Sequence, residues 1–454
     1  MSLPNPIPPN FFPGMATLLN STHDPNRLSW VESANDSEGD FPLQNLPFGV
    51  FQTSGTETAR IGVAIGDQVF DLAGASSDGL IPDEVRRACC QPSLNALMAL
   101  GPTNWTALRA RLSELLGADT CPPGPLRDAV WRRLSTQTAV RMLVPARVEN
   151  FTDFYASSFH AATVGSMFRP DSPLLPNYKW VPIGYHGRAS SIIMSGTPVR
   201  RPLGQLKLPD QPAPVFCPTR SLDYELELAA YIGPGNPLGS PIPVARAREH
   251  LFGVSLLNDW SARDIQSWEY QPLGPFLAKN FATSVSPWVV TLAALEPFRA
   301  PALSRPTGDP APLPHLADPG DQADGGLDVV LETLLLTSRM RAAGESAHRL
   351  SQGNFSAMYW TLAQMVAHHT SNGCNLRPGD VLGSGTVSGP EPASSGCLLE
   401  LTRGGTRPLT LPNGETRAFL QDGDEVILRG FAQKPGFRRI GLGECRGLIQ
   451  PAGA

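Results

Sequence analysis

Proline and glycine interrupt this chain so often that long helices cannot make up most of its structure. The 454 residues include 43 glycines and 46 prolines. Both residue types favour turns, and proline also removes a backbone donor from any helix or central strand that it enters. We therefore expect a mainly β, α+β fold built from many turns and short strands.

The length and the charge of the chain limit its architecture and its partners. A chain of 454 residues exceeds one ordinary core, so we expect two domains of unequal size. The formal net charge is -5, with 36 basic and 41 acidic residues, and we find no Lys/Arg-rich run. We therefore expect no nucleic-acid partner and no membrane partner.

Two further features indicate a soluble cytoplasmic protein. The seven cysteines are odd in number and form no CxxC pair, which fits a reducing compartment. The N-terminus lacks a basic segment followed by a continuous apolar stretch, and no apolar run is long enough to span a membrane.

The sequence divides into three regions. Residues 1–28 are rich in Pro and Asn and predict a poorly ordered extension. Residues 29–145 begin with short antiparallel strands and continue with helices in SLNALMALG and TALRARLSELLG, which end in glycine. Residues 146–454 contain the polar motifs, and the Pro-rich stretch 299–326 is expected to be a surface loop.

Four acidic residues in separate segments are candidate ligands of one divalent cation: Asp153, Glu225, Glu227 and Asp259. In LDYELEL, two glutamates at i and i+2 share one face of a strand, while Tyr224, Leu226 and Leu228 share the other. A hard cation seeks several carboxylate oxygens. The alternative is a half-buried strand with a solvated acidic face.

Two residues far apart in the sequence are candidates for proton transfer. His160 lies in TDFYASSFHAATVGSMFR among Asp153, Tyr155 and Arg169. Histidine can accept a proton near neutral pH, but as a base it needs an orienting carboxylate, and a satisfied structural histidine is the alternative. Glu400, in GCLLELT, is expected in a strand, where an inward carboxylate would need a partner such as histidine.

Several polar residues could contact a negatively charged ligand. If NDWSARDIQSWEY becomes helical, Arg263, Gln266 and Tyr270 share one face that could bind carboxylate or enolate oxygens. The alternative is a solvated helix in which nearby acidic residues offset the arginine. Lys279 and Thr283 follow in an otherwise apolar stretch, and Thr386 lies in the glycine-rich GDVLGSGTVSGPE.

Long motifs in this chain closely resemble the fumarylacetoacetate hydrolase family. They are TDFYASSFHAATVGSMFR, VPIGYHGRASSI, SLDYELELA, NDWSARDIQSWEYQPLGPFLAKNF, HHTSNGCNLRPGDVLGSGTVSGPEP and DGDEVILRG. The resemblance runs from about Trp30 to the C-terminus. It implies a small SH3-like N-terminal barrel, a mixed β-roll catalytic domain and a homodimer.

The same resemblance implies a role for each site residue. Calcium would be held by Asp153, Glu225, Glu227 and Asp259, and a second cation, usually magnesium, is associated with Asp259, Lys279 and Thr283. The substrate positions correspond to Tyr155, Arg169, Tyr185, Gln266, Tyr270 and Thr386. His160 and Glu400 correspond to the catalytic dyad, and Arg263, Gln266 and Lys279 would stabilise the oxyanion.

The implied reaction is metal-dependent hydrolysis of a carbon–carbon bond in 4-fumarylacetoacetate. Its products are fumarate and acetoacetate, at the last step of tyrosine and phenylalanine degradation. Two alternatives stay open: a related acylpyruvate hydrolase, 2-oxo acid decarboxylase or hydratase on the same scaffold, and a non-catalytic protein whose cation only joins loops.

Overall fold

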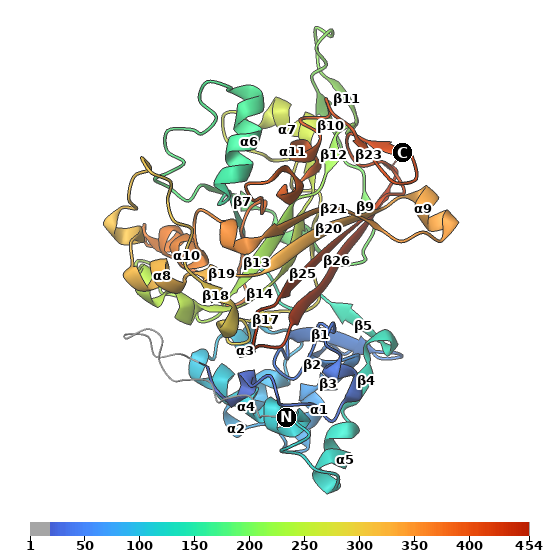
Figure 1. The fold of residues 1–454 in the computed structure, drawn as a ribbon, viewed down its shortest axis with the longest axis vertical. Coiled ribbons are helices and arrows are strands. Elements are labelled where there is room, and N and C mark those ends of the chain that lie inside the picture. Colours follow the sequence, from blue (N-terminus) through green and yellow to red (C-terminus); the bar gives the residue numbers. More distant parts are fainter. Residues whose placement is uncertain (1–18, 454) are drawn as a thin grey trace, which may run out of the picture.

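A computed structural model describes residues 19–453 of the chain (Figure 1). The predicted N-terminal extension lies outside the described residues as far as residue 18. From there the chain packs onto the N-terminal part: Ser21–His23 forms a 3-10 helix, and Arg27 Nη1 donates to Ser113 Oγ at 2.6 Å.

The N-terminal part is built on one antiparallel sheet, as its short apolar runs predicted. Five strands pair in the order β4-β3-β2-β1-β5. Their bounds are β1 (Phe48–Thr53), β2 (Arg60–Ile65), β3 (Gln68–Asp71), β4 (Leu134–Thr136) and β5 (Val140–Leu143). The SH3-like barrel implied by the resemblance and the domain boundary near residue 145 stay predictions.

Helices follow β3, also as predicted. They are α1 (Leu72–Ser77), α2 (Asp83–Cys89), α3 (Asn95–Met98), α4 (Pro102–Leu116) and α5 (Pro125–Trp131). Helix α4 starts with proline at its first position, where the missing N–H has no intrahelical partner, and ends at Gly117. No helix among residues 19–453 is long and apolar enough to cross a membrane.

The C-terminal part contains an eight-stranded mixed sheet with the main path β7-β6-β22-β13-β14-β16-β8 and β17 paired to β14. Its strands are β6 (Phe151–Phe154), β7 (Gly184–Gly187), β8 (Ile192–Met194), β13 (Leu226–Ile232), β14 (Leu251–Asp259), β16 (Thr283–Val285), β17 (Val290–Thr291) and β22 (Val381–Gly383). Two of its pairs, β6 with β22 and β8 with β16, are parallel.

A second sheet of five strands pairs in the order β21-β20-β25-β26-β9. Its strands are β9 (Val199–Arg200), β20 (Val330–Leu336), β21 (His348–Asn354), β25 (Glu425–Ala432) and β26 (Ile440–Gln450). Four two-stranded pairs complete the strands of the described chain: β10 (Leu203–Leu206) with β11 (Val215–Pro218), β12 (Leu222–Asp223) with β15 (Ser261–Ala262), β18 (Arg299–Ala300) with β19 (Gly326–Leu327), and β23 (Leu409–Thr410) with β24 (Thr416–Arg417).

The two ends of the Pro-rich stretch 299–326 meet, because β18 and β19 pair there. Most residues between them are exposed or half-buried, so the stretch lies at the surface as expected. The C-terminal helices are α6 (Ser158–Phe168), α7 (Arg263–Glu269), α8 (Pro319–Asp324), α9 (Ser338–Ala343), α10 (Leu362–Thr370) and α11 (Leu398–Leu401). The chain is α+β as expected, although helical turns cover about as many residues as strands do.

Alternate residues of the large sheet divide between two cores. On β13, Leu226 and Leu228 belong to the core of the C-terminal part. Ala229 and Tyr231, which share a face with Glu227, belong to the core of the N-terminal part. The N-terminal part therefore covers one end of the same sheet face that carries the acidic residues.

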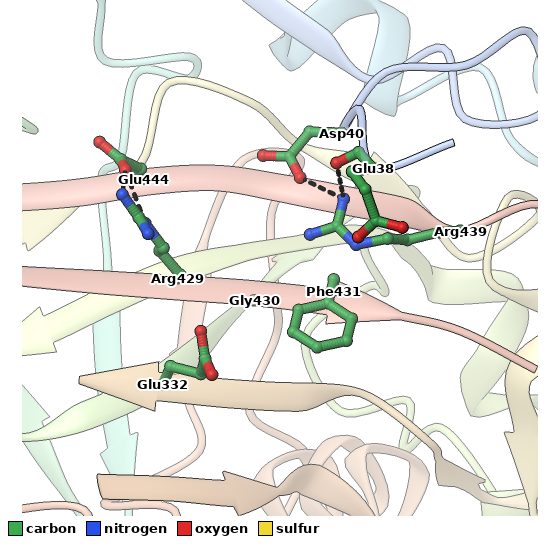
Figure 2. A pocket seen from close by; sticks show the side chains of 8 residues that line it. All are labelled: Glu38, Asp40, Glu332, Arg429, Gly430, Phe431, Arg439 and Glu444. Atoms are coloured by element: carbon green, nitrogen blue, oxygen red, sulfur yellow. Dashed lines mark hydrogen bonds and ion pairs between the residues drawn. The ribbon is translucent and has the colours of Figure 1, made fainter. Parts of the chain in front are cut away.

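A charged cavity of about 340 Å³ lies where the segment before β1 meets the second sheet (Figure 2). Arg439 Nη1 donates to Asp40 Oδ1 at 2.7 Å and to the Glu38 carbonyl at 2.9 Å, and its guanidinium lies over the ring of Phe431. None of the predicted site residues lines this cavity. Its contacts attach the N-terminal part to β25 and β26.

Asn45 provides a stability test of this attachment. Its buried Nδ2 donates to the carbonyls of Asp40 and Gly441, both at 2.7 Å. Asn45→Ala should lower the free energy of unfolding by about 1–3 kcal/mol, because the buried carbonyls of Asp40 and Gly441 would each lose a hydrogen-bond donor. Urea denaturation measures the change, with exposed Asn26→Ala as the control. Equal effects of the two variants would contradict this assignment.

Candidate active site

Neighbouring strands of the large sheet bring four acidic residues together. Asp153 lies on β6 opposite Gly383 of β22, Glu227 lies on β13, Glu225 immediately precedes β13, and Asp259 ends β14. One oxygen from each carboxylate lies within 4.8 Å of the others. All four residues are buried. The alternative of a solvated acidic face is therefore wrong, and the opposite residues Tyr224, Leu226 and Leu228 lie in the core as predicted.

Glycine on β22 makes this convergence possible. Gly383 pairs with Asp153 on one side and with Ala229 on the other. A Cβ atom at Gly383 would lie 2.4 Å from Asp153 Oδ1 and 3.1 Å from Glu227 Oε2. Gly385, with φ at +74°, turns its N–H to donate to Glu227 Oε2 at 3.0 Å and to Asp153 Oδ1 at 3.2 Å.

Two cationic side chains balance one half of the cluster. Lys279 Nζ lies 2.5 Å from Glu225 Oε2 and 2.8 Å from Asp259 Oδ2, and Arg263 Nη1 donates to Glu225 Oε1 at 2.7 Å. Burial alone would raise the pKa of Glu225, but Lys279 and Arg263 hold it well below its usual range. Glu225 is therefore ionised.

The other half of the cluster lacks such a counter-charge. Burial, followed by repulsion from Asp259, raises the pKa of Asp153, and burial with repulsion from Asp153 raises that of Glu227. No lysine or arginine forms an ion pair with either carboxylate within residues 19–453. Glu227 Oε1 is buried without a hydrogen-bond partner there. A divalent cation fits this set of converging, under-bonded oxygens.

The residues expected around a second cation also meet here. Thr283 Oγ1 donates to Asp259 Oδ1 at 3.0 Å, and Tyr185 Oη donates to Asp259 Oδ2 at 2.7 Å. Burial and the nearby carboxylates raise the pKa of Tyr185 well above its ordinary value, so the hydroxyl keeps its proton. The Lys279 ammonium occupies the space between Glu225 and Asp259.

His160 and Glu400 form a buried pair. His160 Nδ1 lies 2.7 Å from Glu400 Oε2, and both residues are nearly inaccessible to solvent. Ser388 Oγ also donates to Glu400 Oε2 at 2.8 Å. Burial alone would raise the pKa of Glu400, but His160 and these hydrogen bonds lower it. The carboxylate can therefore orient the imidazole through its Nδ1 atom.

The secondary structure predicted for Glu400 is wrong. The residue lies in the short helix α11, where Leu398 and Leu401 belong to or pack against the core. Alternation of leucine and glutamate over so few residues does not separate a strand from one helical turn. Helices α6, α7 and α11 gather at the end of the molecule opposite the N-terminal part (Figure 1).

The residues predicted to contact an anion are only partly brought together. Arg263 Nη1 donates to Gln266 Oε1 at 3.2 Å on α7, which confirms their shared face. The ring of Tyr155 contacts His160 edge to face, with centroids 5.3 Å apart. Thr386 is buried, and its Oγ1 lacks a partner within the described chain. Arg169 and Tyr270 follow the ends of α6 and α7 and are exposed.

Several residues of the site were not identified from the sequence. Asp223, Ser388 and Cys397 all contact predicted site residues, and the carboxylates of Asp153 and Glu227 lie against Gly383. Asp223 had a signal, because it continues the alternation of Glu225 and Glu227 by one further step. The serine and the cysteine had none, since isolated residues of these types are common in buried loops.

Comparison with known proteins identifies the family. The protein-family model described as fumarylacetoacetate (FAA) hydrolase C-terminal matches residues 150–450. A second family model, described as fumarylacetoacetase N-terminal, matches residues 44–145. The chain belongs to the fumarylacetoacetate hydrolase family.

Curated relatives match over nearly their whole length. The fumarylacetoacetase of Bos taurus is 50% identical over 431 residues, covering 94% of this chain and 99% of the relative. The fumarylacetoacetases of Homo sapiens and Arabidopsis thaliana are each 48% identical, covering 94% and 93% of this chain and 99% and 98% of those proteins. A solved fumarylacetoacetate hydrolase from Exiguobacterium antarcticum, 20% identical, matches 89% of this chain and 99% of its own with a TM-score of 0.48.

Gly383→Ala tests whether the carboxylates bind a cation. The added methyl group would press on Asp153 Oδ1 and spread the cluster, so calcium affinity should fall at least about tenfold, as for other changes that misplace metal ligands. Isothermal titration calorimetry measures the affinity. Gly39→Ala, whose Cβ would lie no closer than 3.3 Å to any atom, is the control. Unchanged calcium binding in Gly383→Ala would count against the site.

The raised pKa values predict how pH affects the metal-free protein. Because Asp153 and Glu227 hold protons more tightly folded than unfolded, their contribution to stability is lost as pH rises through their raised pKa values. A cation that replaces these protons should therefore raise the Tm more at about pH 8 than at about pH 5. Differential scanning calorimetry with calcium and with a chelator measures the rise in Tm at each pH. Glu227→Gln should reduce the difference between the two rises. An equal gain at both pH values would contradict the assignment.

Proposed function

We propose that this protein hydrolyses 4-fumarylacetoacetate to fumarate and acetoacetate, the last step of tyrosine and phenylalanine degradation. The observation that carries the proposal is a buried histidine–carboxylate pair beside four converging carboxylates. The fumarylacetoacetases that match almost the full chain support the same reaction. The proposed substrate is 4-fumarylacetoacetate itself and not another acylpyruvate.

In the proposed reaction His160 is the general base. Its Nδ1 faces Glu400, so the Nε2 atom is left to take a proton from water. The water oxygen forms a bond to the carbonyl carbon of the fumaryl group. The carbon–carbon bond to the acetoacetate fragment then breaks, and its electron pair stays on that fragment as an enolate. Protonation of the enolate by His160 completes the turnover.

The negative charge that develops on the attacked carbonyl needs nearby donors. Arg263, Gln266 and Lys279 are the proposed oxyanion donors, and the first two are held together by their own hydrogen bond. Arg263 and Lys279 both contact Glu225. Since burial limits screening by water, these cations act strongly on a charge formed among them.

A bound divalent cation would supply a Lewis acid for the two oxygens of the diketone. We assign calcium to Asp153, Glu225, Glu227 and Asp259, and magnesium to Asp259, Lys279 and Thr283. Lysine would have to contribute its carbonyl, because its ammonium is not a ligand. The proposed substrate contacts are Tyr155, Arg169, Tyr185, Gln266, Tyr270 and Thr386.

The biological setting is proposed with the reaction. A homodimer is expected from the family resemblance. A cytoplasmic location is supported by the cysteines, all of which are free thiols. A decarboxylase or hydratase on the same scaffold is the alternative function, and product identification separates it from the hydrolase.

Replacement of the proposed base tests the function directly. His160→Ala should lower kcat for 4-fumarylacetoacetate at least about a hundredfold, the usual scale for a general base, while KM changes little. Absorbance of the conjugated diketone follows the reaction. His315→Ala, at an exposed histidine, should match the unsubstituted protein. Near-normal turnover in His160→Ala would remove this residue from the mechanism.

A further inference from the structure

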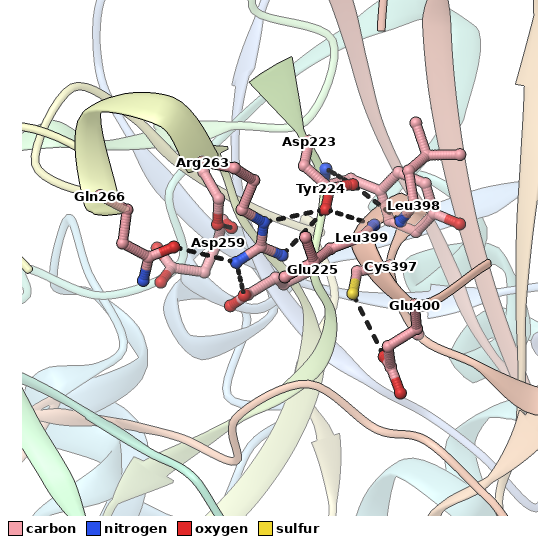
Figure 3. Close-up of polar contacts among 12 residues, drawn as sticks. Asp223, Tyr224, Glu225, Asp259, Arg263, Gln266, Cys397, Leu398, Leu399 and Glu400 are labelled. Atoms are coloured by element: carbon pink, nitrogen blue, oxygen red, sulfur yellow. Dashed lines mark hydrogen bonds and ion pairs between the residues drawn. The ribbon is translucent and has the colours of Figure 1, made fainter. Parts of the chain in front are cut away.

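Asp223 is a fully buried carboxylate that the proposed mechanism does not use. It ends β12, two residues before Glu225. Its Oδ1 atom accepts hydrogen bonds from the backbone N–H groups of Tyr224 and Leu398, both at 2.8 Å. Its Oδ2 atom accepts from Arg263 Nε and from the Leu399 N–H, both at 2.9 Å (Figure 3).

The donors around Asp223 belong to two different parts of the site. Arg263 starts α7, and its Nη1 atom continues from Asp223 to Glu225 Oε1. Leu398 and Leu399 form the first turn of α11, and the next residue is Glu400. The Asp223 carboxylate therefore accepts hydrogen bonds both from Arg263, the proposed oxyanion donor, and from the turn of α11 that carries Glu400.

We propose that Asp223 is a positioning residue that holds Arg263 and the His160–Glu400 pair in their working arrangement. This proposal rests on the proposed function, because it assigns Asp223 a role in that reaction. Helix α11 has only four residues and cannot be rigid by itself. The hydrogen bonds that Asp223 accepts fix the first turn of α11 to the end of β12, two residues before Glu225.

The side chain at this position must be a carboxylate. Every group that contacts the Asp223 carboxylate is a donor: each oxygen accepts two hydrogen bonds, and Arg263 Nη2 also lies 2.9 Å from Oδ2. An asparagine in the same place would turn its NH₂ group toward two donors in either orientation of the amide. One set of contacts would be lost: either Arg263 Nε and Leu399 N–H, or Tyr224 N–H and Leu398 N–H.

Asp424 offers a matched control for a purely structural role. It is also fully buried and binds an arginine, since Arg417 Nε and Nη2 donate to its two oxygens at 2.8 and 2.9 Å. The backbone N–H of Gln421 donates to it as well. Neither Asp424 nor Arg417 contacts the acidic cluster, His160 or Glu400 in the described chain.

The experiment compares Asp223→Asn with Asp424→Asn in the full-length protein loaded with calcium. Both variants should lower the Tm. Only Asp223→Asn should lower kcat for 4-fumarylacetoacetate, by about ten- to a hundredfold at a temperature where both are folded, with KM nearly unchanged. Asp223→Glu, which keeps both oxygens, should recover part of the loss.

A spectroscopic readout separates this proposal from the reaction itself. In histidine-labelled protein, the NMR signal of His160, assigned with His160→Ala, should shift in Asp223→Asn and stay in place in Asp424→Asn. If the unsubstituted protein does not cleave the diketone, the proposed function fails while this signal still tests the positioning. An unmoved His160 signal with normal kcat in Asp223→Asn, or equal kcat losses in both variants, would overturn the role of Asp223.

Discussion

Four carboxylates buried close together repel one another, and the surrounding residues have to balance this repulsion. Two unit charges 4 Å apart cost roughly 4 kcal/mol at an effective dielectric constant of about 20. Lys279 and Arg263 offset the charge at Glu225 and Asp259. Asp153 and Glu227 form no ion pair with a lysine or arginine of residues 19–453, both accept from the N–H of Gly385, and burial raises the pKa of each. A divalent cation bound by these oxygens would offset the charge that Lys279 and Arg263 leave unbalanced.

The architecture explains how such a site stays in place. On each central strand, the site residue shares a face with an apolar residue two positions away. Phe151 accompanies Asp153, Leu257 accompanies Asp259, and Val285 accompanies Thr283. These apolar neighbours all lie in the core of the N-terminal part. The N-terminal part buries the end of the sheet face that carries these apolar residues. It therefore holds in place the strands that carry the polar groups at their other ends. In this account the N-terminal part supports the site without contributing any of its predicted residues.

Much of this arrangement could be predicted from the sequence, because its signals were periodic or belonged to long motifs. The alternation in LDYELEL identified the face shared by Glu225 and Glu227, and helical spacing identified Arg263 with Gln266. The sequence around Glu400 predicts a strand where the structure has α11, because one helical turn is too short to reveal its period. The role of Gly383 depends on which strands are neighbours, and that pairing joins segments far apart in the sequence. Asp223 was overlooked although the alternation reaches it, since nothing local shows that all its partners are donors.

We propose that the acidic cluster and the His160–Glu400 pair act together on a diketone. The most direct measurement follows the absorbance of 4-fumarylacetoacetate with the purified protein, with and without a chelator, and identifies the products. We expect the absorbance to fall as equal amounts of fumarate and acetoacetate form. Exhaustive chelation should abolish the reaction, and added calcium should restore it. An unchanged rate after the metal is removed, or products other than these two acids, would contradict the proposal.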